Sequence, residues 1–276
     1  MDLGLRRKVV LIVGASSGVG AATARLLSAE GARVALVARG GSALAELSAL
    51  LGTTESVLPM TADASVSGAM DDAVARTVAH FGALHGLAVI AAPMGARAPL
   101  GDLSNADWEF YYRNSLMVAV EACRAAIPQL TRHPNSSAVL TSAYSIRAQK
   151  PQLVAYTAMK SAVASISKNL AKTYGGEGLR VNCIAPGIIV GKRGVAEKSD
   201  APQRTDVPRT SDVPQKSAVP PERARYESVR REFGMTVALE RAGRHEEFAD
   251  LIAYLLSERA SYISGATINI DGGTDF

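Results

Sequence analysis

An apolar run, a glycine-rich turn and a helical pattern follow one another without a gap near the start of the chain. Lys8 to Val13 (KVVLIV) has the length and composition of a strand buried on both faces. Residues 14–20 (GASSGVG) lead from it into a helical pattern that ends at Gly31. Such glycines let the main chain approach a pyrophosphate, and a helix N-terminus offers free N–H groups and a positive dipole. The order predicts a phosphate-binding turn; the alternative is a tight turn without a ligand.

Strand-like and helical segments continue to alternate along the 276 residues, which are enough for one large α/β domain. This alternation predicts an α/β fold with a parallel sheet and helices on both faces. The further predicted strands are 33–38, 56–60, 84–92, 138–142, 179–185 and 267–270. The predicted helices are 42–51, 69–80, 106–130, a long one that starts near Val154, and 246–257.

Tyr156 and Lys160 lie four residues apart in the long helical segment, which should stop at the pair Gly175 and Gly176. Residues at this spacing share one face of a helix. A nearby ammonium favours the phenolate, so we expect the pKa of Tyr156 to fall from its usual value of about 10 towards neutrality. That would make Tyr156 a general acid or base near neutral pH.

The residues after the second and third strands concern the cofactor. In dinucleotide-binding folds the residue after the second strand meets the adenosine ribose, where an acid would repel a 2′-phosphate. Here Ala38 leaves room and Arg39 offers a cation, so NADP(H) is favoured over NAD(H); the alternative is a solvated surface Arg. Asp63 follows the third strand and either accepts a hydrogen bond from adenine or caps the next helix.

Two further polar residues are candidates for the site. Asn114 is a polar residue inside the predicted helix 106–130. Ser142 ends the fifth strand, and ligands of open α/β sheets bind beyond the carboxyl ends of their strands. Residues 95–100 (GARAPL) and Ile188 to Val190 are expected to contribute to the substrate pocket.

Composition excludes several other classes. Two cysteines, Cys123 and Cys183, give neither metal spacing nor a disulfide framework, so no metal is expected. Met1 to Lys8 does not read as a signal peptide and no apolar run is long enough for a membrane span, which predicts a cytoplasmic protein without a membrane partner. Of the net charge of +4, most falls between Lys192 and Glu232, where acids interrupt the basic residues. That pattern does not favour nucleic-acid binding.

Residues 199–222 divide into four hexads: SDAPQR, TDVPRT, SDVPQK and SAVPPE. Prolines at this density predict polyproline-like or disordered chain rather than helix. The hexads are either a tandem-duplicated surface insertion without chemistry or a specific lid or partner-docking strip.

Taken together, these motifs resemble those of the short-chain dehydrogenase/reductase family over almost the whole chain. The likeness includes Gly14, Gly18 and Gly20, the YTAMK segment with Tyr156 and Lys160, and residues 180–182, 186–187, 239–247 and 271–273. The resemblance implies one Rossmann-type, doubly wound parallel sheet of about seven strands over 1–276. Residues 192–235 would be an extended substrate lid that contains the hexads. It also implies a homotetramer or homodimer that transfers hydride between a nicotinamide and an alcohol or carbonyl substrate.

The resemblance implies roles for matching residues. Tyr156 would protonate the carbonyl oxygen, Lys160 would depress the pKa of Tyr156 and hold the nicotinamide ribose, Ser142 would hydrogen-bond the substrate oxygen, and Asn114 would position a water that links Lys160 to solvent. The expected cofactor contacts are Gly14, Ser16, Ser17, Gly18, Val19, Gly20, Arg39, Asp63, Ala64, Tyr156, Lys160, Pro186, Gly187 and Ile189.

The sequence departs from the family pattern at four places. Val13 replaces a Thr, residues 89–92 replace an Asn-Asn-Ala-Gly motif, Gly191 replaces a Thr, and Ser142 lies fourteen residues before Tyr156 where thirteen is commonest. The main hypothesis is an NADP(H)-dependent carbonyl reductase or secondary-alcohol dehydrogenase. The alternatives are an NAD(H)-dependent dehydrogenase and a catalytically idle nicotinamide-binding sensor.

Overall fold

The computed structural model describes residues 2–91, 93–190 and 220–274. Its centre is a seven-stranded sheet with the order β3-β2-β1-β4-β5-β6-β7, in which every neighbouring pair is parallel. The strands are β1 (Val9–Val13), β2 (Arg33–Ala38), β3 (Val57–Thr61), β4 (Gly86–Val89), β5 (Ser137–Thr141), β6 (Arg180–Pro186) and β7 (Thr267–Ile270). This confirms the predicted doubly wound α/β fold.

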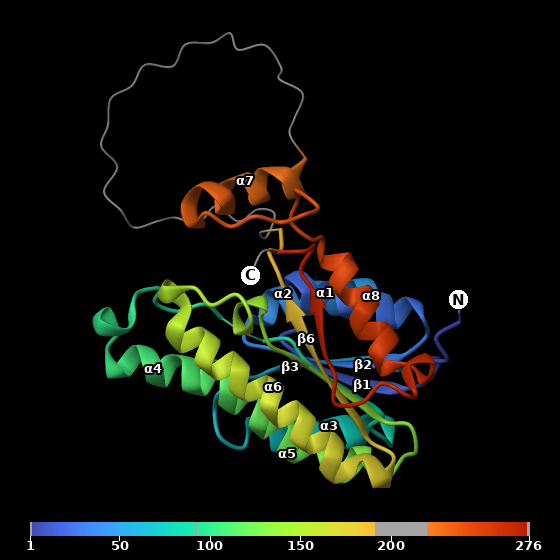
Figure 1. The fold of residues 1–276 in the computed structure, drawn as a ribbon. Helices are drawn as coiled ribbons and strands as arrows, with labels where there is room; N and C mark the ends of the chain where they lie inside the picture. Colours follow the sequence, from blue (N-terminus) through green and yellow to red (C-terminus); the bar gives the residue numbers. More distant parts are fainter. Residues whose placement is uncertain (1, 92, 191–219, 275–276) are drawn as a thin grey trace.

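Helices cover both faces of the sheet, as Figure 1 shows. One face carries α1 (Gly18–Ala29), α2 (Gly41–Leu51) and α8 (His245–Leu256). The other face carries α3 (Ala69–Phe81), α5 (Val118–Leu130) and α6 (Val154–Tyr174). Each parallel strand is therefore buried on both sides, which explains the continuous apolar runs.

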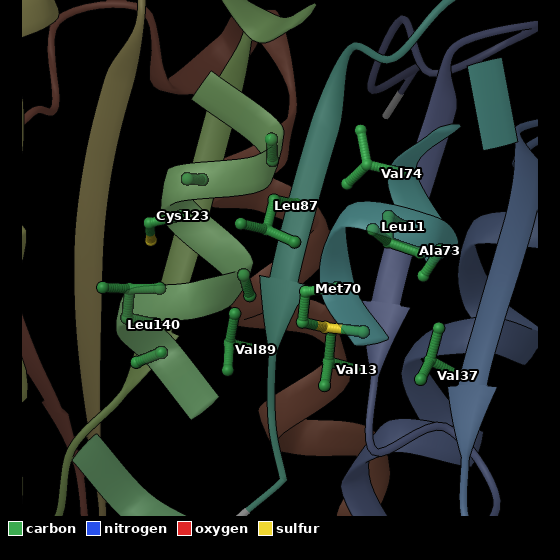
Figure 2. Close-up of a cluster of buried hydrophobic side chains, with 14 of the residues drawn as sticks. Leu11, Val13, Val37, Met70, Ala73, Val74, Leu87, Val89, Cys123 and Leu140 are labelled. Atoms are coloured by element: carbon green, nitrogen blue, oxygen red, sulfur yellow. The ribbon is translucent and has the colours of Figure 1, made fainter. Parts of the chain in front are cut away.

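Alternate residues of the central strands divide between the two cores. Leu11 and Val13 of β1 pack with Met70 of α3 in the cluster that Figure 2 shows. Val10 and Ile12 point to the opposite face and pack beside α1 and α8. All five residues of β1 are buried, so the strand that leads into the glycine turn is held firmly from both sides.

Two predicted elements differ in detail. The helix expected over 106–130 is α4 (Asn105–Tyr111) followed by a π-helical turn (Tyr112–Met117) and then α5. The fourth strand ends at Val89, because the N–H groups of Ile90 and Ala91 both bond to the main-chain oxygen of Val13. That bond pair draws the chain after β4 towards the glycine turn.

A helix that the sequence did not predict, α7 (Pro221–Phe233), lies on the carboxyl side of the sheet (Figure 1). The expectation of polyproline-like chain is wrong for the end of the fourth hexad, because Pro221 occupies the first turn of this helix, where its missing N–H does no harm. Tyr226 and Val229 anchor α7 in a small apolar cluster with Ile188 and Met235. The rest of the hexads, and the predicted lid up to residue 219, lie outside the described residues.

Candidate active site

A cavity of about 860 Å³ opens at the carboxyl ends of the strands. Residues that end or follow β1 to β6 line it, because the carboxyl ends of parallel strands meet at one edge of the sheet. Within the described part of the chain, its wall includes every predicted cofactor contact except Lys160: Gly14, Ser16, Ser17, Gly18, Val19, Gly20, Arg39, Asp63, Ala64, Tyr156, Pro186, Gly187 and Ile189.

The glycine turn forms the cradle at one side of this cavity. A Cβ on Gly14 would lie 2.7 Å from the main-chain nitrogen of Ala91, and one on Gly20 would collide with the oxygen of Gly14. These two glycines therefore let the turn close. Gly18 starts α1 with a φ of +56°, and the first N–H groups of a helix have no partner inside it. The cradle fits a pyrophosphate group.

Arg39 and Asp63 lie farther along the wall, after β2 and β3. The Asp63 carboxylate accepts bonds from the main-chain nitrogen of Ser65 at 2.9 Å and from its hydroxyl at 2.7 Å. Together with the Arg39 guanidinium, these bonds hold the pKa of Asp63 below its usual value despite partial burial. Asp63 thus stabilises its own turn, while α3 begins after Gly68. The exposed Arg39 places a cation at this end of the cavity.

Tyr156 and Lys160 lie one turn apart in α6, as their spacing predicts. Lys160 is 1% exposed, and its Nζ donates a 2.8 Å hydrogen bond to the main-chain oxygen of Thr141 at the end of β5. The same nitrogen is 5.8 Å from the ring centre of Tyr156. The Tyr111 ring meets the Tyr156 ring edge to face at 5.8 Å. Lys160 therefore lies behind Tyr156, whereas Tyr156 faces the cavity.

The expected fall in the pKa of Tyr156 is wrong for this structure. Burial raises that pKa, the neighbouring phenols of Tyr111 and Tyr144 raise it further, and only Arg97 opposes them. Burial also lowers the pKa of Lys160 to about 8, because its ammonium is removed from water. At neutral pH Tyr156 therefore carries its proton, the form that a general acid needs.

Ser142 and Asn114 both line the cavity. The Ser142 hydroxyl is buried and donates to the main-chain oxygen of Lys160 at 2.8 Å. Asn114 lies in the π-helical turn, and its Nδ2 donates to the oxygen of Phe110 at 2.9 Å. A π-helical turn inside an α-helix often marks a functional site. The hydroxyl of Thr141, also on the wall, is buried and has no hydrogen-bond partner among the described residues.

The end of β6 closes the floor of the cavity. The N–H of Gly187 bonds to the oxygen of Ile270 at 3.0 Å, and a Cβ on Gly187 would lie 2.6 Å from the Cα of Asp271. Ile189 then pairs with Gly243 in a parallel bridge. Gly191, where the family pattern has a Thr, lies outside the described residues.

Sequence reasoning missed several residues that line the same cavity: Tyr144, Lys150, Gln152, Arg225 and His245. Arg97 belongs to the segment 95–100 that was expected at the pocket. His245 lies in the segment 239–247 of the family likeness but was not assigned to the site, and Tyr144, Lys150, Gln152 and Arg225 carry no motif of their own, so only the folded chain brings these residues together. His245 starts α8 next to the cradle, with its Nε2 3.5 Å from where a Cβ of Gly18 would lie.

In the described ranges, no group of three or more His, Cys, Asp or Glu side chains could hold a metal ion. Among those same residues, none of the helices combines the length and the apolar character that crossing a membrane requires. Cys123 and Cys183 are both buried as free thiols.

Known proteins similar to this chain show its family. Residues 8–201 match the family model described as short chain dehydrogenase, and residues 212–275 match one described as enoyl-(acyl carrier protein) reductase. Over 272 residues the chain is 30% identical to short-chain dehydrogenase/reductase aba4 of Botryotinia fuckeliana (strain B05.10), with 96% of each chain covered.

Two further relatives have more specific names. The chain is 29% identical over 268 residues to cis-4-hydroxycyclohexanecarboxylate dehydrogenase of Sinomonas cyclohexanicum, with 96% of each covered. Among solved structures, L-sorbose reductase from Gluconobacter frateurii, complexed with NADPH and L-sorbose, has a TM-score of 0.81 and 26% identity. That match covers 99% of this chain and 98% of the other.

Proposed function

Because the chain belongs to the short-chain dehydrogenase/reductase family of NAD(P)-dependent oxidoreductases, which act on alcohol and ketone substrates, we propose that it interconverts a ketone and a secondary alcohol with NADP(H). The observation that carries the proposal is the protonated Tyr156 on the cavity wall with the Lys160 ammonium behind it. When bound, the cofactor supplies the hydride that reaches the carbonyl carbon.

In the direction of reduction, Tyr156 transfers its phenolic proton to the carbonyl oxygen, and the substrate leaves as an alcohol. The phenolate that remains is stabilised by the Lys160 ammonium, which the bond to Thr141 holds 5.8 Å from the ring centre. With its pKa lowered to about 8, Lys160 is also suited to pass on a proton that restores Tyr156. In the direction of oxidation, Tyr156 first gives its proton to the neutral amine of Lys160, and the resulting phenolate then accepts the proton of the alcohol.

Ser142 and Asn114 complete the proposed group. Ser142 would donate to the substrate oxygen by turning its hydroxyl away from the main-chain oxygen of Lys160, its partner in the free enzyme. Asn114 would position a water that links Lys160 to solvent. The hydroxyl of Thr141, which has no hydrogen-bond partner in the described part of the chain, is a further polar group for such a water.

NADP(H) is the proposed cofactor because Arg39 presents a cation after β2 and the preceding Ala38 carries no acid. The structural relative complexed with NADPH supports the same choice. An NAD(H)-dependent dehydrogenase is the second candidate, since Arg39 is exposed and could remain solvated. The proposal extends to a cytoplasmic homotetramer or homodimer, for which family membership is the support.

The test follows the absorbance of reduced nicotinamide with NADPH and NADH in parallel against a panel of ketones. We expect NADPH oxidation with at least one ketone, and a loss of well over tenfold in kcat for Tyr156→Phe. A Tyr156→Phe enzyme that retains a tenth or more of the activity would refute the mechanism. Tight NADPH binding without turnover of any ketone would instead support an idle nicotinamide-binding protein.

A further inference from the structure

The cavity wall beyond the cradle is cationic. Of the Lys and Arg side chains on the wall, Arg39 belongs to the adenosine end, and the others are Arg97, Lys150 and Arg225. These three come from separate parts of the chain: the loop after β4, the loop before α6, and α7. Among the described wall residues the only carboxylate is Asp63, which lies near Arg39 and is bonded to Ser65. Lys150 and Arg225 therefore face no carboxylate other than Asp63 among the described wall residues.

Arg97 and Lys150 lie on the same wall as Tyr156. The charge of Arg97 lowers the pKa of Tyr156, so its guanidinium is within electrostatic range of the phenol. Lys150 is half-buried and directly precedes the short turn that leads into α6 and Tyr156. A negatively charged ligand beside Tyr156 would therefore be attracted by Arg97, and Lys150 adds a second cation to the same wall.

Arg225 is held over the same region by the packing of α7. It shares a helix face with Val229, four residues on, and both line the cavity. Val229 belongs to the apolar cluster against which Tyr144 packs, and Tyr144 in turn raises the pKa of Tyr156. A main-chain bond of 3.0 Å from Ala242 to the oxygen of Glu222 fixes the start of the helix.

The guanidinium of Arg225 has an unused donor. Its Nε is buried without a hydrogen-bond partner among the described residues. The two acids of α7 whose side chains the structure describes act elsewhere: Glu227 pairs with Arg223 at 3.4 Å, and Glu222 acts on Arg241. Leaving a buried guanidinium nitrogen without a partner costs free energy, and a bound oxyanion removes that cost. The planar guanidinium can bind an oxyanion through two parallel hydrogen bonds.

We propose that Arg225, with Lys150 and Arg97, binds an oxyanion of the substrate, so that the ketone presented to Tyr156 also bears a carboxylate or a phosphate. This proposal rests on the function proposed above, because it assigns the substrate class of the same site. On this proposal the enzyme selects its substrate mainly by charge, rather than by the shape of its apolar part.

The experiment compares charged and neutral ketones that are otherwise alike. The pairs are levulinate with its methyl ester, and dihydroxyacetone phosphate with dihydroxyacetone. We expect the wild-type enzyme to prefer the charged member of at least one pair by tenfold or more in kcat/KM, and the favoured pair identifies carboxylate or phosphate. Equal values within both pairs, or a preference for the neutral members, would overturn the proposal.

Substitution then tests the assignment to Arg225. Arg225→Gln should raise KM for the charged ketone by about tenfold or more, the effect expected for a lost bond between charged groups. The KM for NADPH and for the neutral partner should stay within twofold. Arg230→Gln, an exposed arginine of the same helix, is the matched control and should change none of these constants. A rise in KM for NADPH alone would show that Arg225 serves the cofactor and refute the proposal.

Calorimetric titration separates this proposal from the reductase function. Levulinate and dihydroxyacetone phosphate are titrated into wild-type and Arg225→Gln protein with NADP+ present, without turnover. Binding to the wild type that weakens at least tenfold in the variant supports the oxyanion site even if no ketone is reduced. Absence of binding by both compounds to a wild-type enzyme that reduces neutral ketones would refute the oxyanion site and leave the reductase function standing.

Discussion

The Ser142 hydroxyl donates its hydrogen to the main-chain oxygen of Lys160, at 2.8 Å. This bond joins the residue after β5 to α6, one helical turn after Tyr156. It also occupies the donor that Ser142 would offer to a substrate oxygen. Ser142 therefore has two possible uses for one hydrogen, which substitution can distinguish.

If Ser142 turns its hydroxyl to the substrate during reduction, Ser142→Ala should lower kcat by roughly 10²–10³, as for other lost donors to a reacting oxygen. It should also lower the free energy of unfolding by about 1 kcal/mol, because the bond to Lys160 is lost. Steady-state kinetics and thermal melting measure the two effects. Ser167→Ala in α6 is the control, since the Ser167 hydroxyl is buried without a partner among the described residues. An unchanged kcat would restrict Ser142 to the structural bond.

The rate of reduction should fall as the pH rises through about 8. Below that value Lys160 carries its charge and stabilises the phenolate left on Tyr156; above it the ammonium is lost. Tyr156, whose pKa is raised, stays protonated over the same range, so it causes no second change in rate along the pH profile. The measurement is kcat for NADPH-driven reduction between pH 6 and 10. A profile that stays flat through pH 8 and 9 would contradict the role given to Lys160.

Lys160→Met should remove activity and stabilise the fold. The pKa of Lys160 is about 8 in the folded chain and 10.5 in the reference state, so between these values the unfolded chain binds more protons. Wild-type stability therefore rises with pH across that window, and the full penalty of the buried charge applies at pH 7. Methionine fills similar space without a charge, and the gain should be on the order of 1–3 kcal/mol, reduced by loss of the bond to Thr141.

Chemical denaturation at pH 7 and pH 10 tests the sign of this effect. The advantage of Lys160→Met over the wild type should shrink at the higher pH, since the wild type then buries a neutral amine. A variant that is less stable at both pH values would show that the bond to Thr141 outweighs the buried charge.

Arg39→Ala should raise KM for NADPH by about tenfold or more and leave KM for NADH within twofold. The reason is that a guanidinium contact to the 2′-phosphate exists only for the phosphorylated cofactor. Arg25→Ala, an exposed position on α1 away from the wall residues, is the control. If the ratio of the two KM values does not move, NADP(H) preference does not depend on Arg39.

Local patterns predicted the fold and the position of the site. The apolar run of β1 and the spacing of Tyr156 and Lys160 depend only on neighbouring residues, and both have the predicted form. The pKa of Tyr156 could not be predicted in the same way. Its direction depends on burial and on Tyr111 and Tyr144, which the chain brings together from other elements.

The same limit applies to α7 and Arg225. A proline-rich segment shows no helical spacing of apolar residues, and proline is tolerated in the first turn of a helix. The start of α7 at Pro221 could therefore not be predicted from the sequence. The π-helical turn at Asn114 is also hidden, because one extra residue in a turn changes hydrogen bonding without changing composition. Both features are seen only in the folded chain, α7 through its packing against Ile188 and Met235, and the π-helical turn through its own main-chain hydrogen bonding.

The strand order has a consequence for how the protein is made. β1 lies between β2 and β4, while β7, which supports Gly187 at the cavity floor, comes from the last part of the described chain. Strands this distant in sequence pair slowly, because the entropy cost of closing a long loop comes before the contacts that offset it. A partly synthesised chain can already form the glycine turn near residue 14, but it lacks β7, which supports the cavity at Gly187. Catalytic competence should therefore arise late, in one step, when the final strand joins the sheet.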